Sequence, residues 1–360
     1  MRNSSSKTVL VSGGAGYIGS HVTYLLKQRG FTPIVIDSLV TGNKWATRYA
    51  SSFRQADVAD ASAVKALCEA FNPVAALHFA AFIEVGESVL NPQKYFSNNR
   101  DKARVFFEVL SEQNVDKIIF SSTAAVYGEP MGGTPLIEDC PGLPINPYGR
   151  SKLDAELQLR SIPGITSVIL RYFNVAGSAA KSGLGEAHYP ETHLIPRLVL
   201  SLLDVPEDIQ RGLGIGKAFK VYGQDHKTRD GSAVRDYLHV LDLAEAHVLA
   251  LEYLLDGGAS QILNLGTGRG YSVWEIVRAA AEVLGRPEFE PILGERRPGD
   301  PATLVASGKR ASETLGWSPK RDISEMIQSA AAWHQSAFYA EAMRAKIETA
   351  NAILDAGIAG

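Results

Sequence analysis

The sequence predicts an α/β protein, a doubly wound parallel sheet followed by a smaller mixed α/β domain. Three observations support this prediction. An apolar run at 8–12 leads into a glycine-rich loop and an amphipathic segment. Short apolar runs then alternate with helical segments as far as residue 170, and the alternation loosens after residue 176. Repeated strand and helix are typical of parallel sheets covered on both faces.

Length and composition narrow the class of protein. The chain has 360 residues, of which 45% are hydrophobic and 21% charged, enough for one large domain or two ordinary ones. A net charge of -3 gives no electrostatic footprint for nucleic acid or a membrane surface. Cys68 and Cys140 make no disulfide framework or metal cluster, so we expect no metal and a reduced, cytoplasmic setting. The polar segment 1–7 lacks the apolar core of a signal peptide, and no apolar run is long enough to span a bilayer.

The first strand leads into a loop suited to a dinucleotide. Residues 8–12 form a short buried strand, and glycines follow at Gly13, Gly16 and Gly19. Glycines allow a tight turn and close approach to a pyrophosphate, and the helix N-terminus adds amide donors and positive dipole. The spacing Gly-x-x-Gly-x-x-Gly differs from the standard fingerprint, and glycines serving turn geometry alone are the alternative.

The second strand, 32–36, ends at Asp37. An acid about 20 residues beyond the glycines is where a cofactor ribose is held. A carboxylate there accepts bonds from a free 2′-hydroxyl and repels a 2′-phosphate, so the sequence favours NAD over NADP. Asp37 as a cap of the following loop is the alternative.

The alternation then continues to the middle of the chain. We expect strands at 53–56, 74–81, 117–120 and 166–170, and helices at 61–71, 92–113 and 147–160. Ligands bind past the carboxyl ends of such strands, where Asp37, Asp57, Phe79, Ala80 and the hydroxyl run 121–123 fall. His78 lies inside an apolar strand and is expected to be a core residue.

Tyr148 and Lys152 are four residues apart and therefore share one face of the 147–160 helix. An ammonium near a phenol favours the phenolate and lowers the tyrosine pKa from about 10 toward neutral. Tyr148 is thus a candidate base for a hydroxyl proton. A half-buried core tyrosine beside a solvated lysine is the alternative for this pair taken by itself.

After residue 176 shorter strands mix with helices. We expect strands at 219–222, 261–264 and about 288–292, with helices near 194–204, 241–255, 272–285 and 322–334. The predicted units are a Rossmann-type NAD-binding domain at 8–175, a smaller mixed α/β domain at 176–334 from which part of the chain returns to the first, and a helical tail at 335–360. The nature of the second domain rests on the resemblance described next. In the tail, Phe338, Met343 and Ile347 are expected to face inward.

Seven ordered motifs carry a family resemblance. They are Gly-x-x-Gly-Tyr-Ile-Gly-Ser-His from Gly13, His78–Ala81, Val85–Ser88, Ser121–Gly128, Pro147–Lys152, Leu170–Asn174 and Val234–Val240. Together they resemble UDP-glucose (UDP-galactose) 4-epimerases of the extended short-chain dehydrogenase/reductase family, over about 8–334. The ordered set outweighs the alternative given above for Tyr148 and Lys152.

The resemblance implies a mechanism and a cofactor. Tyr148 takes the proton of the sugar 4-hydroxyl while NAD takes the C4 hydride, and the 4-keto sugar turns over before the hydride returns. Lys152 bonds the nicotinamide ribose, and Thr123 bridges the sugar 4-oxygen and the tyrosine. Related dehydratases and decarboxylases carry an acid just after this Thr. Ala124 and Ala125 stand there and cannot move a proton, which favours epimerisation.

The resemblance also implies that 176–334 is a UDP-sugar-binding domain, and it implies contact residues. The implied cofactor-binding residues are Gly13, Gly16, Tyr17, Ile18, Gly19, Asp37, Asp57, Val58, Phe79, Ala80, Ala81, Asn98, Ser121, Tyr148, Lys152 and Tyr172. The implied substrate-binding residues are Thr123, Tyr148, Asn174, His193, Leu194, Tyr222, Arg235, Arg297, Asp300 and Leu304. Among these, Asn174 and the two arginines are expected at the UDP diphosphate, Tyr222 near the uracil and Asp300 at the uridine ribose.

Three departures from the family pattern leave the identity of the sugar undecided. Ile83 replaces a lysine that some relatives carry near the cofactor, and His193 replaces an asparagine beside the sugar nucleotide. Leu304 aligns with the residue that limits space around the sugar, so a UDP-N-acetylhexosamine or a UDP-xylose/UDP-arabinose 4-epimerase is the alternative. A regulator that senses NAD(H) without catalysis is the alternative of another class. We expect a homodimer through the helices near 92–110 and 147–160.

Overall fold

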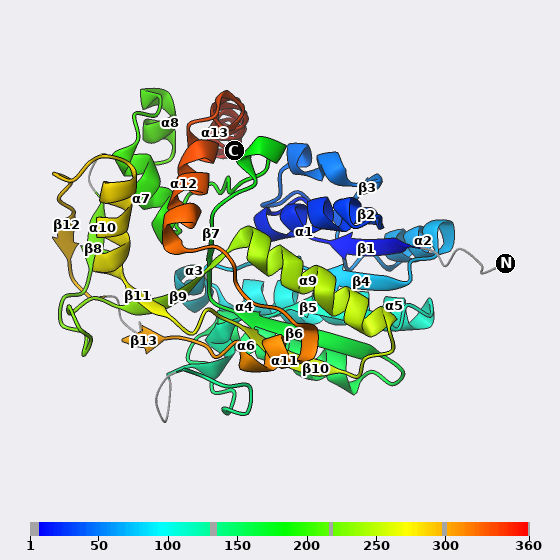
Figure 1. Cartoon of the computed structure of the whole chain (residues 1–360). Coiled ribbons are helices and arrows are strands. Elements are labelled where there is room, and N and C mark those ends of the chain that lie inside the picture. The colour runs from blue at the N-terminus through cyan, green and yellow to red at the C-terminus, as the bar shows by residue number, and fades with distance from the viewer. Residues whose placement is uncertain (1–6, 130–134, 216–218, 297–300, 359–360) are drawn as a thin grey trace.

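The computed structural model describes residues 7–129, 135–215, 219–296 and 301–358. A seven-stranded parallel sheet forms its centre, in the order β10-β6-β5-β4-β1-β2-β3 (Figure 1). Its strands are β1 Thr8–Ser12, β2 Thr32–Asp37, β3 Ser52–Gln55, β4 Ala75–His78, β5 Lys117–Ser121, β6 Thr166–Tyr172 and β10 Gln261–Leu265. The predicted doubly wound sheet is confirmed, and all its strands end at the edge where the candidate site lies.

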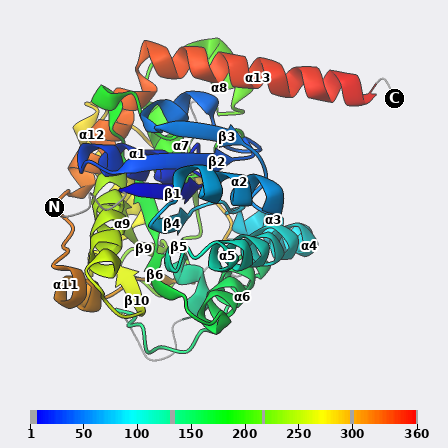
Figure 2. The same cartoon turned by 90° about the vertical axis from the view of Figure 1, so that its right-hand side faces the viewer.

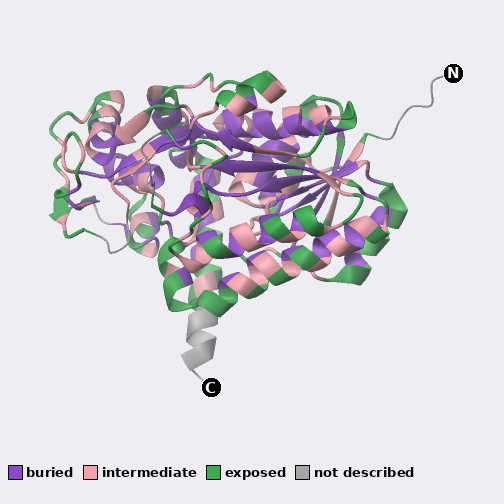
Figure 3. Ribbon diagram, turned by 90° about the horizontal axis from the view of Figure 1, so that it is seen from below, coloured by how far each residue is buried: buried purple, intermediate pink, exposed green. Residues whose placement is uncertain are grey.

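Helices cover both faces of this sheet (Figure 2). Helices α1 (Tyr17–Gln28) and α9 (Val240–Leu255) cover one face, and α2 (Ala61–Phe71), α5 (Ala103–Glu112) and α6 (Pro147–Ser161) cover the other. The alternation of strand side chains explains the two cores. Val9 and Val11 pack on the α1/α9 side, while Leu10 packs with Phe106 of α5 on the opposite side. Buried residues therefore run through the middle of the sheet (Figure 3), while the edge strand β3 contains none.

The predicted helix at 92–113 is divided. It comprises α4 (Pro92–Tyr95), a π-helical segment Phe96–Lys102 and α5, and a short helix α3 (Val85–Leu90) precedes it. A π-helical segment shifts the residues it contains by part of a turn relative to an α-helix. This placement decides which asparagine faces the site, as described below.

The smaller unit is built around a second sheet. Strands β11 (Gly270–Ser272), β9 (Val234–His239) and β13 (Thr303–Leu304) are neighbours, and β7 (Asn174–Ala176) pairs with β9. Strand β8 (Lys220–Tyr222) pairs with β12 (Ile292–Gly294), so the strand expected at 288–292 begins only at Ile292. The helices here are α7 Leu194–Leu202, α8 Glu207–Gly212, α10 Val273–Val283, α11 Lys309–Leu315 and α12 Ile323–His334. The apolar faces of α7, α8, α10 and α12 form a separate core with β8 and β9, whereas Ala311 of α11 packs in the core on the α1/α9 side of the large sheet.

The chain crosses between the two sheets. Strand β9 belongs to the smaller sheet, α9 returns to cover the large sheet, and β10 joins its edge beside β6. A return of this kind was expected, although the domain boundaries themselves stay a prediction. Within the described residues, no helix is both long and apolar enough to cross a membrane.

The predicted tail helix is α13, which runs from Ala337 to Ile358 and projects from the body at its far end (Figure 2). Met343 and Ile347 are buried, and Phe338 packs against the core of the smaller unit. The inward face expected from the sequence is confirmed.

Candidate active site

The glycine loop is held tightly against the strand end beside it. Gly13 has φ +72°, and a Cβ there would lie 2.5 Å from the amide nitrogen of Ala80, which follows β4. A Cβ on Gly19 would lie 2.2 Å from the Gly13 carbonyl oxygen. Gly16 is the N-cap of α1, and no side chain of the described residues caps this helix. Its first amides and positive dipole therefore suit an anion such as a pyrophosphate.

Asp37 ends β2 directly beside this loop. Its carboxylate accepts from the amide of Ala15 at 2.9 Å and from the amide of Leu39 at 2.8 Å. Burial raises the pKa of Asp37, and the two amide bonds partly offset that shift. The carboxylate is thus fixed in orientation beside the glycine loop, an arrangement that fits a dinucleotide ribose.

Tyr17 and Ile18 begin α1 under the same loop. The Tyr17 hydroxyl donates to the Gly177 carbonyl at 2.6 Å, which ties α1 to the segment after β7. Ile18 packs against the core of the α1/α9 side. At the end of β3, the Asp57 carboxylate pairs with Lys102 at 2.5 Å, and the adjacent Val58 is buried.

The loop after β4 is fixed by a residue that the sequence analysis missed. Phe79, Ala80 and Ala81 are half-buried there, and Asn99 holds the next residue by accepting from the Phe82 amide at 2.8 Å and donating to its carbonyl at 2.9 Å. The predicted contact residue Asn98 donates to the Asn99 side chain at 3.1 Å. Both lie in the π-helical segment, whose register the sequence does not reveal.

Helix α6 brings the tyrosine and lysine together. Asn146 caps the helix by accepting from the Gly149 amide at 2.8 Å, and Pro147 occupies the first turn. Gly149 allows close packing, because a Cβ there would lie 2.5 Å from the Ala125 carbonyl oxygen. This contact places Tyr148 near the turn that begins at Thr123, whose hydroxyl lowers the pKa of the phenol.

Lys152 lies one turn further along the same face and is 2% exposed. Its Nζ is 4.2 Å from the centre of the Phe120 ring. Burial lowers the pKa of Lys152 to about 7, and Glu156 opposes this shift. The same amine, next to the apolar strand β4, contributes after burial to lowering the pKa of His78 to about 3. His78 stacks on Phe106 and Phe120 inside the core, as expected.

The expected lowering of the Tyr148 pKa is wrong for the protein alone. Burial raises this pKa, the Thr123 hydrogen bond lowers it, and the Glu84 carboxylate raises it further. The sequence argument weighed only the charge of Lys152. Loss of hydration is the largest influence on this phenol.

Glu156 and Arg171 form a buried support that the sequence analysis did not identify. Arg171 donates to the Glu156 carboxylate at 3.0 Å and 2.5 Å, and the Ser122 hydroxyl donates to the same carboxylate. The side chains of Glu156 and Arg171 are 2% and 6% exposed. The pair joins α6 to β6 and to the hydroxyl run after β5. Spacing alone placed Glu156 one turn beyond Lys152 and could have drawn attention to it.

The neighbouring strand ends supply two predicted hydroxyls. Ser121 ends β5 and Tyr172 ends β6, and their hydroxyl groups are hydrogen-bonded to each other. Burial raises the pKa of Tyr172. Ser121 thus lies on the strand that leads to Thr123, and Tyr172 lies on the adjacent strand β6 as a neutral hydroxyl.

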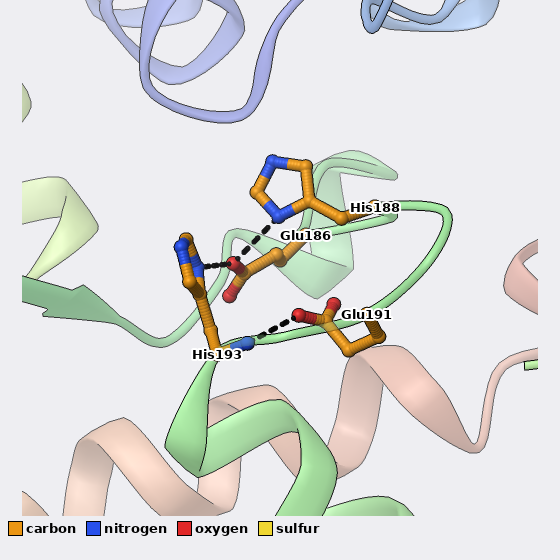
Figure 4. Close-up of side chains that lie close together, drawn as sticks. All are labelled: Glu186, His188, Glu191 and His193. Atoms are coloured by element: carbon orange, nitrogen blue, oxygen red, sulfur yellow. Dashed lines mark hydrogen bonds and ion pairs between the residues drawn. The ribbon is translucent and has the colours of Figure 1, made fainter. Parts of the chain in front are cut away.

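The segment before α7 contains a cluster of charged groups at two predicted positions and beside them (Figure 4). Glu186 accepts a hydrogen bond from His193 and lies 3.0 Å from Nδ1 of His188, while Glu191 accepts from the His193 amide at 2.9 Å. Burial opposes a charge on His193, but Glu186 outweighs it and raises the His193 pKa to about 10. His193 is thus a cation that begins α7, with Leu194 as the first helical residue.

These donors lie within 4.8 Å of one another, close enough to hold a metal ion. Both imidazoles turn Nδ1 toward the same carboxylate, however, so the four groups are paired among themselves (Figure 4). The absence of a metal stays a prediction. Glu186 and His188 were missed by the sequence analysis, although the repeated Glu-x-His spacing was visible.

Three of the predicted substrate residues, Asn174, Arg235 and Leu304, lie on the second sheet, and Tyr222 lies on the separate strand pair β8/β12. Asn174 pairs with Tyr237 between β7 and β9, and Leu304 pairs with Arg235 between β13 and β9. Leu304 also packs against the small cluster that contains Ala124. Tyr222 lies on β8 beside Lys220. Arg297 and Asp300 lie outside the described residues.

The comparisons with known proteins agree with this arrangement. The model of the NAD dependent epimerase/dehydratase family matches residues 9–266. The UDP-glucose 4-epimerase of Rhizobium leguminosarum bv. trifolii is 44% identical over 333 residues, covering 92% of this chain and 98% of that protein.

Solved structures give the same result. The UDP-glucose 4-epimerase of Brucella ovis in complex with NAD is 42% identical, with a TM-score of 0.83, covering 90% of this chain and 97% of that one. The Bifidobacterium longum UDP-glucose 4-epimerase in complex with NAD+ and UDP is 35% identical, with a TM-score of 0.82, over 91% of this chain and 97% of that one. The chain belongs to the NAD dependent epimerase/dehydratase family. Within that family, these three relatives are UDP-glucose 4-epimerases.

Proposed function

We propose that this protein is an NAD-dependent UDP-glucose 4-epimerase that interconverts UDP-glucose and UDP-galactose. One observation carries the proposal: Tyr148 and the buried Lys152 share one face of α6, and the Thr123 hydroxyl lies near enough to the phenol to lower its pKa. Tyr148 and Thr123 are the groups that handle the sugar 4-hydroxyl. The two residues after Thr123 are Ala124 and Ala125, so no acid stands there for dehydration.

The glycine loop, the first turn of α1 and Asp37 hold NAD, whose bound nicotinamide supplies reversible oxidation at the sugar C4. Tyr148 removes the 4-hydroxyl proton and returns it after the 4-keto sugar has turned over. Thr123 bridges the 4-oxygen and the phenol, and Lys152 supplies positive charge and a donor for the nicotinamide ribose. Proton transfer of this kind contributes about 10²- to 10⁴-fold to the rate.

The smaller unit binds the UDP part. Asn174 on β7 and Arg235 on β9 lie on two strands that pair with each other, and we assign both side chains to the diphosphate, with the His193 cation beside the sugar nucleotide. Guanidinium and imidazolium groups form charge-assisted bonds with phosphate oxygens. The Bifidobacterium relative, solved with NAD+ and UDP, supports both ligand classes.

A homodimer is proposed through the face formed by α3, α4 and α6, which lie together (Figure 2). Leu90 and Leu157 on this face are 80% and 53% exposed. Light scattering of the purified protein checks the dimer, and Leu157→Glu is expected to weaken it. The two free cysteines, Cys68 and Cys140, fit a cytoplasmic setting.

The function is tested by supplying purified protein with UDP-galactose and measuring UDP-glucose. Tyr148→Phe is expected to lose at least about 100-fold in kcat while it keeps bound NAD, because only the proton transfer is removed. Tyr253→Phe on α9, remote from the site, is the matched control and should keep its activity. Full activity in Tyr148→Phe rejects the base assignment.

The same assay separates the alternatives. UDP-N-acetylglucosamine and UDP-xylose are supplied in parallel at equal concentrations. A preference for either over UDP-galactose would replace the proposed substrate but keep the chemistry. Bound NAD without turnover of any UDP-sugar would favour an NAD(H)-sensing regulator.

A further inference from the structure

The helix α13 lies beyond the part of the chain that carries the family resemblance. The sequence resemblance ends near residue 334, and the Rhizobium relative is matched over 98% of its length while covering 92% of this chain. The first part of α13 docks on the body through Tyr339, Met343 and Ile347, which are 1%, 0% and 9% exposed. These apolar contacts account for the docking of the helix, but they leave its polar residue Lys346 unexplained.

Lys346 connects two loops that belong to different units. Its Nζ donates to the Thr41 carbonyl at 3.2 Å, to the Asn43 side-chain oxygen at 3.2 Å and to the Ala187 carbonyl at 3.0 Å. An ammonium has three donors, and three uncharged acceptors from two segments receive them. Burial lowers the pKa of Lys346 to about 8, so the group is largely charged at neutral pH.

Both loops adjoin the candidate cofactor site. The Asn43 amide donates to the Ala15 carbonyl of the glycine loop at 2.8 Å, and its side chain donates to Ala187 at 3.4 Å. A Cβ on Gly42 would lie 2.8 Å from the Asp37 carboxylate. The glycine loop, the 41–46 segment and the 185–188 segment together line one small cavity. The hydrogen bonds by which Lys346 connects the 41–46 and 185–188 segments therefore lie at the edge of the dinucleotide site.

We propose that Lys346 is a positioning residue for the dinucleotide: it holds the 41–43 loop and Ala187 together beside the glycine loop, and so slows release of the cofactor. The inference rests on the proposed function, in which the glycine loop and Asp37 hold NAD. Release requires loops at the edge of a site to separate, and hydrogen bonds from a charged donor oppose that separation. An epimerase regenerates its NAD in every cycle, so slow release does not limit turnover.

The experiment uses the full-length protein loaded with NAD. Lys346→Met keeps the length of the side chain and removes the charge and all three donors, whereas Lys346→Arg keeps both. Arg344→Ala is the matched control on the same helix, because Arg344 pairs at the surface with Asp208 of α8 at 2.6 Å. The rate of NAD loss after rapid gel filtration is measured together with kcat at saturating NAD and the melting temperature.

Lys346→Met is expected to release NAD at least roughly tenfold faster, because all three hydrogen bonds are lost and even one from a charged donor corresponds to about that factor, with kcat at saturating NAD unchanged. Lys346→Arg should restore slow release, and Arg344→Ala should release NAD like the wild type. Lys346→Gln takes the place of the Met variant if that variant does not fold.

Two outcomes overturn the inference. Either Lys346→Met or its Gln substitute releases NAD at the wild-type rate, or Arg344→Ala accelerates release equally, which would assign the effect to helix docking alone. Wild-type protein that binds no NAD would instead reject the proposed function, so the two failures are distinguishable.

Discussion

Glu156→Gln tests the buried support beneath the Tyr148 and Lys152 face. The Glu156 carboxylate is 2% exposed and accepts from Ser122 and from two nitrogens of Arg171, itself 6% exposed. The substituted amide would keep the shape of the side chain but leave the guanidinium buried without an opposite charge. Breaking a buried ion pair in this way costs about 3–5 kcal/mol. We expect the free energy of unfolding to fall by about 3 kcal/mol, because the amide oxygen of the glutamine still accepts a hydrogen bond.

The assay is urea unfolding at pH 7, followed by far-UV circular dichroism. Glu108→Gln is the matched control, since Glu108 pairs with Arg104 on the surface of α5 with side-chain exposures of 45% and 61%. Its loss should stay below about 0.5 kcal/mol. Replacing Glu156 and Arg171 together by Met should recover most of the stability, because neither charge is then left unpaired. The reasoning is refuted if Glu156→Gln costs less than about 1 kcal/mol, or if the double variant is no more stable than the single one.

Three further predictions concern the glycine loop and two titrating groups. Gly13→Ala should lose bound NAD and melt at a lower temperature, because its Cβ would lie 2.5 Å from the main chain at Ala80. Gly30→Ala is the control, since Gly30 has a similar φ but open space around it and should show backbone strain alone. Equal losses in the two variants would contradict a steric clash at Gly13. Lys152→Met should be more stable than the wild type at pH 6. The folded pKa of Lys152 is about 7 and lies below the usual 10.5, so the stability of the wild type rises with pH between these two values. Urea midpoints measured from pH 6 to 10 should show the difference between variant and wild type becoming smaller. Glu186 raises the folded pKa of His193 to about 10, so the stabilisation that His193 contributes is full below pH 6.5 and is lost as pH rises through 10. His193→Gln should lack that decline in stability. If the stability of the variant falls with pH in parallel with that of the wild type, this prediction is wrong.

The parts of the fold that depend on local pattern could be predicted. The strand 8–12, its glycine loop and the following helix are encoded within about twenty residues, because apolar run, glycine spacing and helical periodicity each act locally. Strand β9 was recognised only as a motif. Asp236 inside it is fully buried, and its carboxylate accepts from the Thr267 amide at 3.0 Å and from the Thr267 hydroxyl. The charge is tolerated through partners some thirty residues away, which local periodicity cannot show.

The same distinction divides the site. The shared face of Tyr148 and Lys152 followed from helical spacing alone, and the structure places both there. Asn99 was missed in favour of Asn98, because a π-helical segment changes which side chain faces the loop after β4. Arg171 was read only as part of a motif, since its partner Glu156 lies on another element. Residues that act through tertiary pairing leave little trace in spacing.

The reversed direction of the Tyr148 pKa has a consequence for how the proposed base is formed. In the protein alone burial favours the neutral phenol, and burial of Lys152 favours the neutral amine. Two groups that both resist charge do not by themselves yield a phenolate and an ammonium. The phenolate becomes favourable only when further positive charge and hydrogen-bond donors are assembled around the phenol oxygen, because both lower the pKa of Tyr148. In the proposed reaction the sugar hydroxyl, the Thr123 hydroxyl and the nicotinamide charge are brought to this place together. We infer that the base becomes competent only in the complete complex, so the pH dependence of kcat should report a lower pKa for Tyr148 than titration of the protein without ligands.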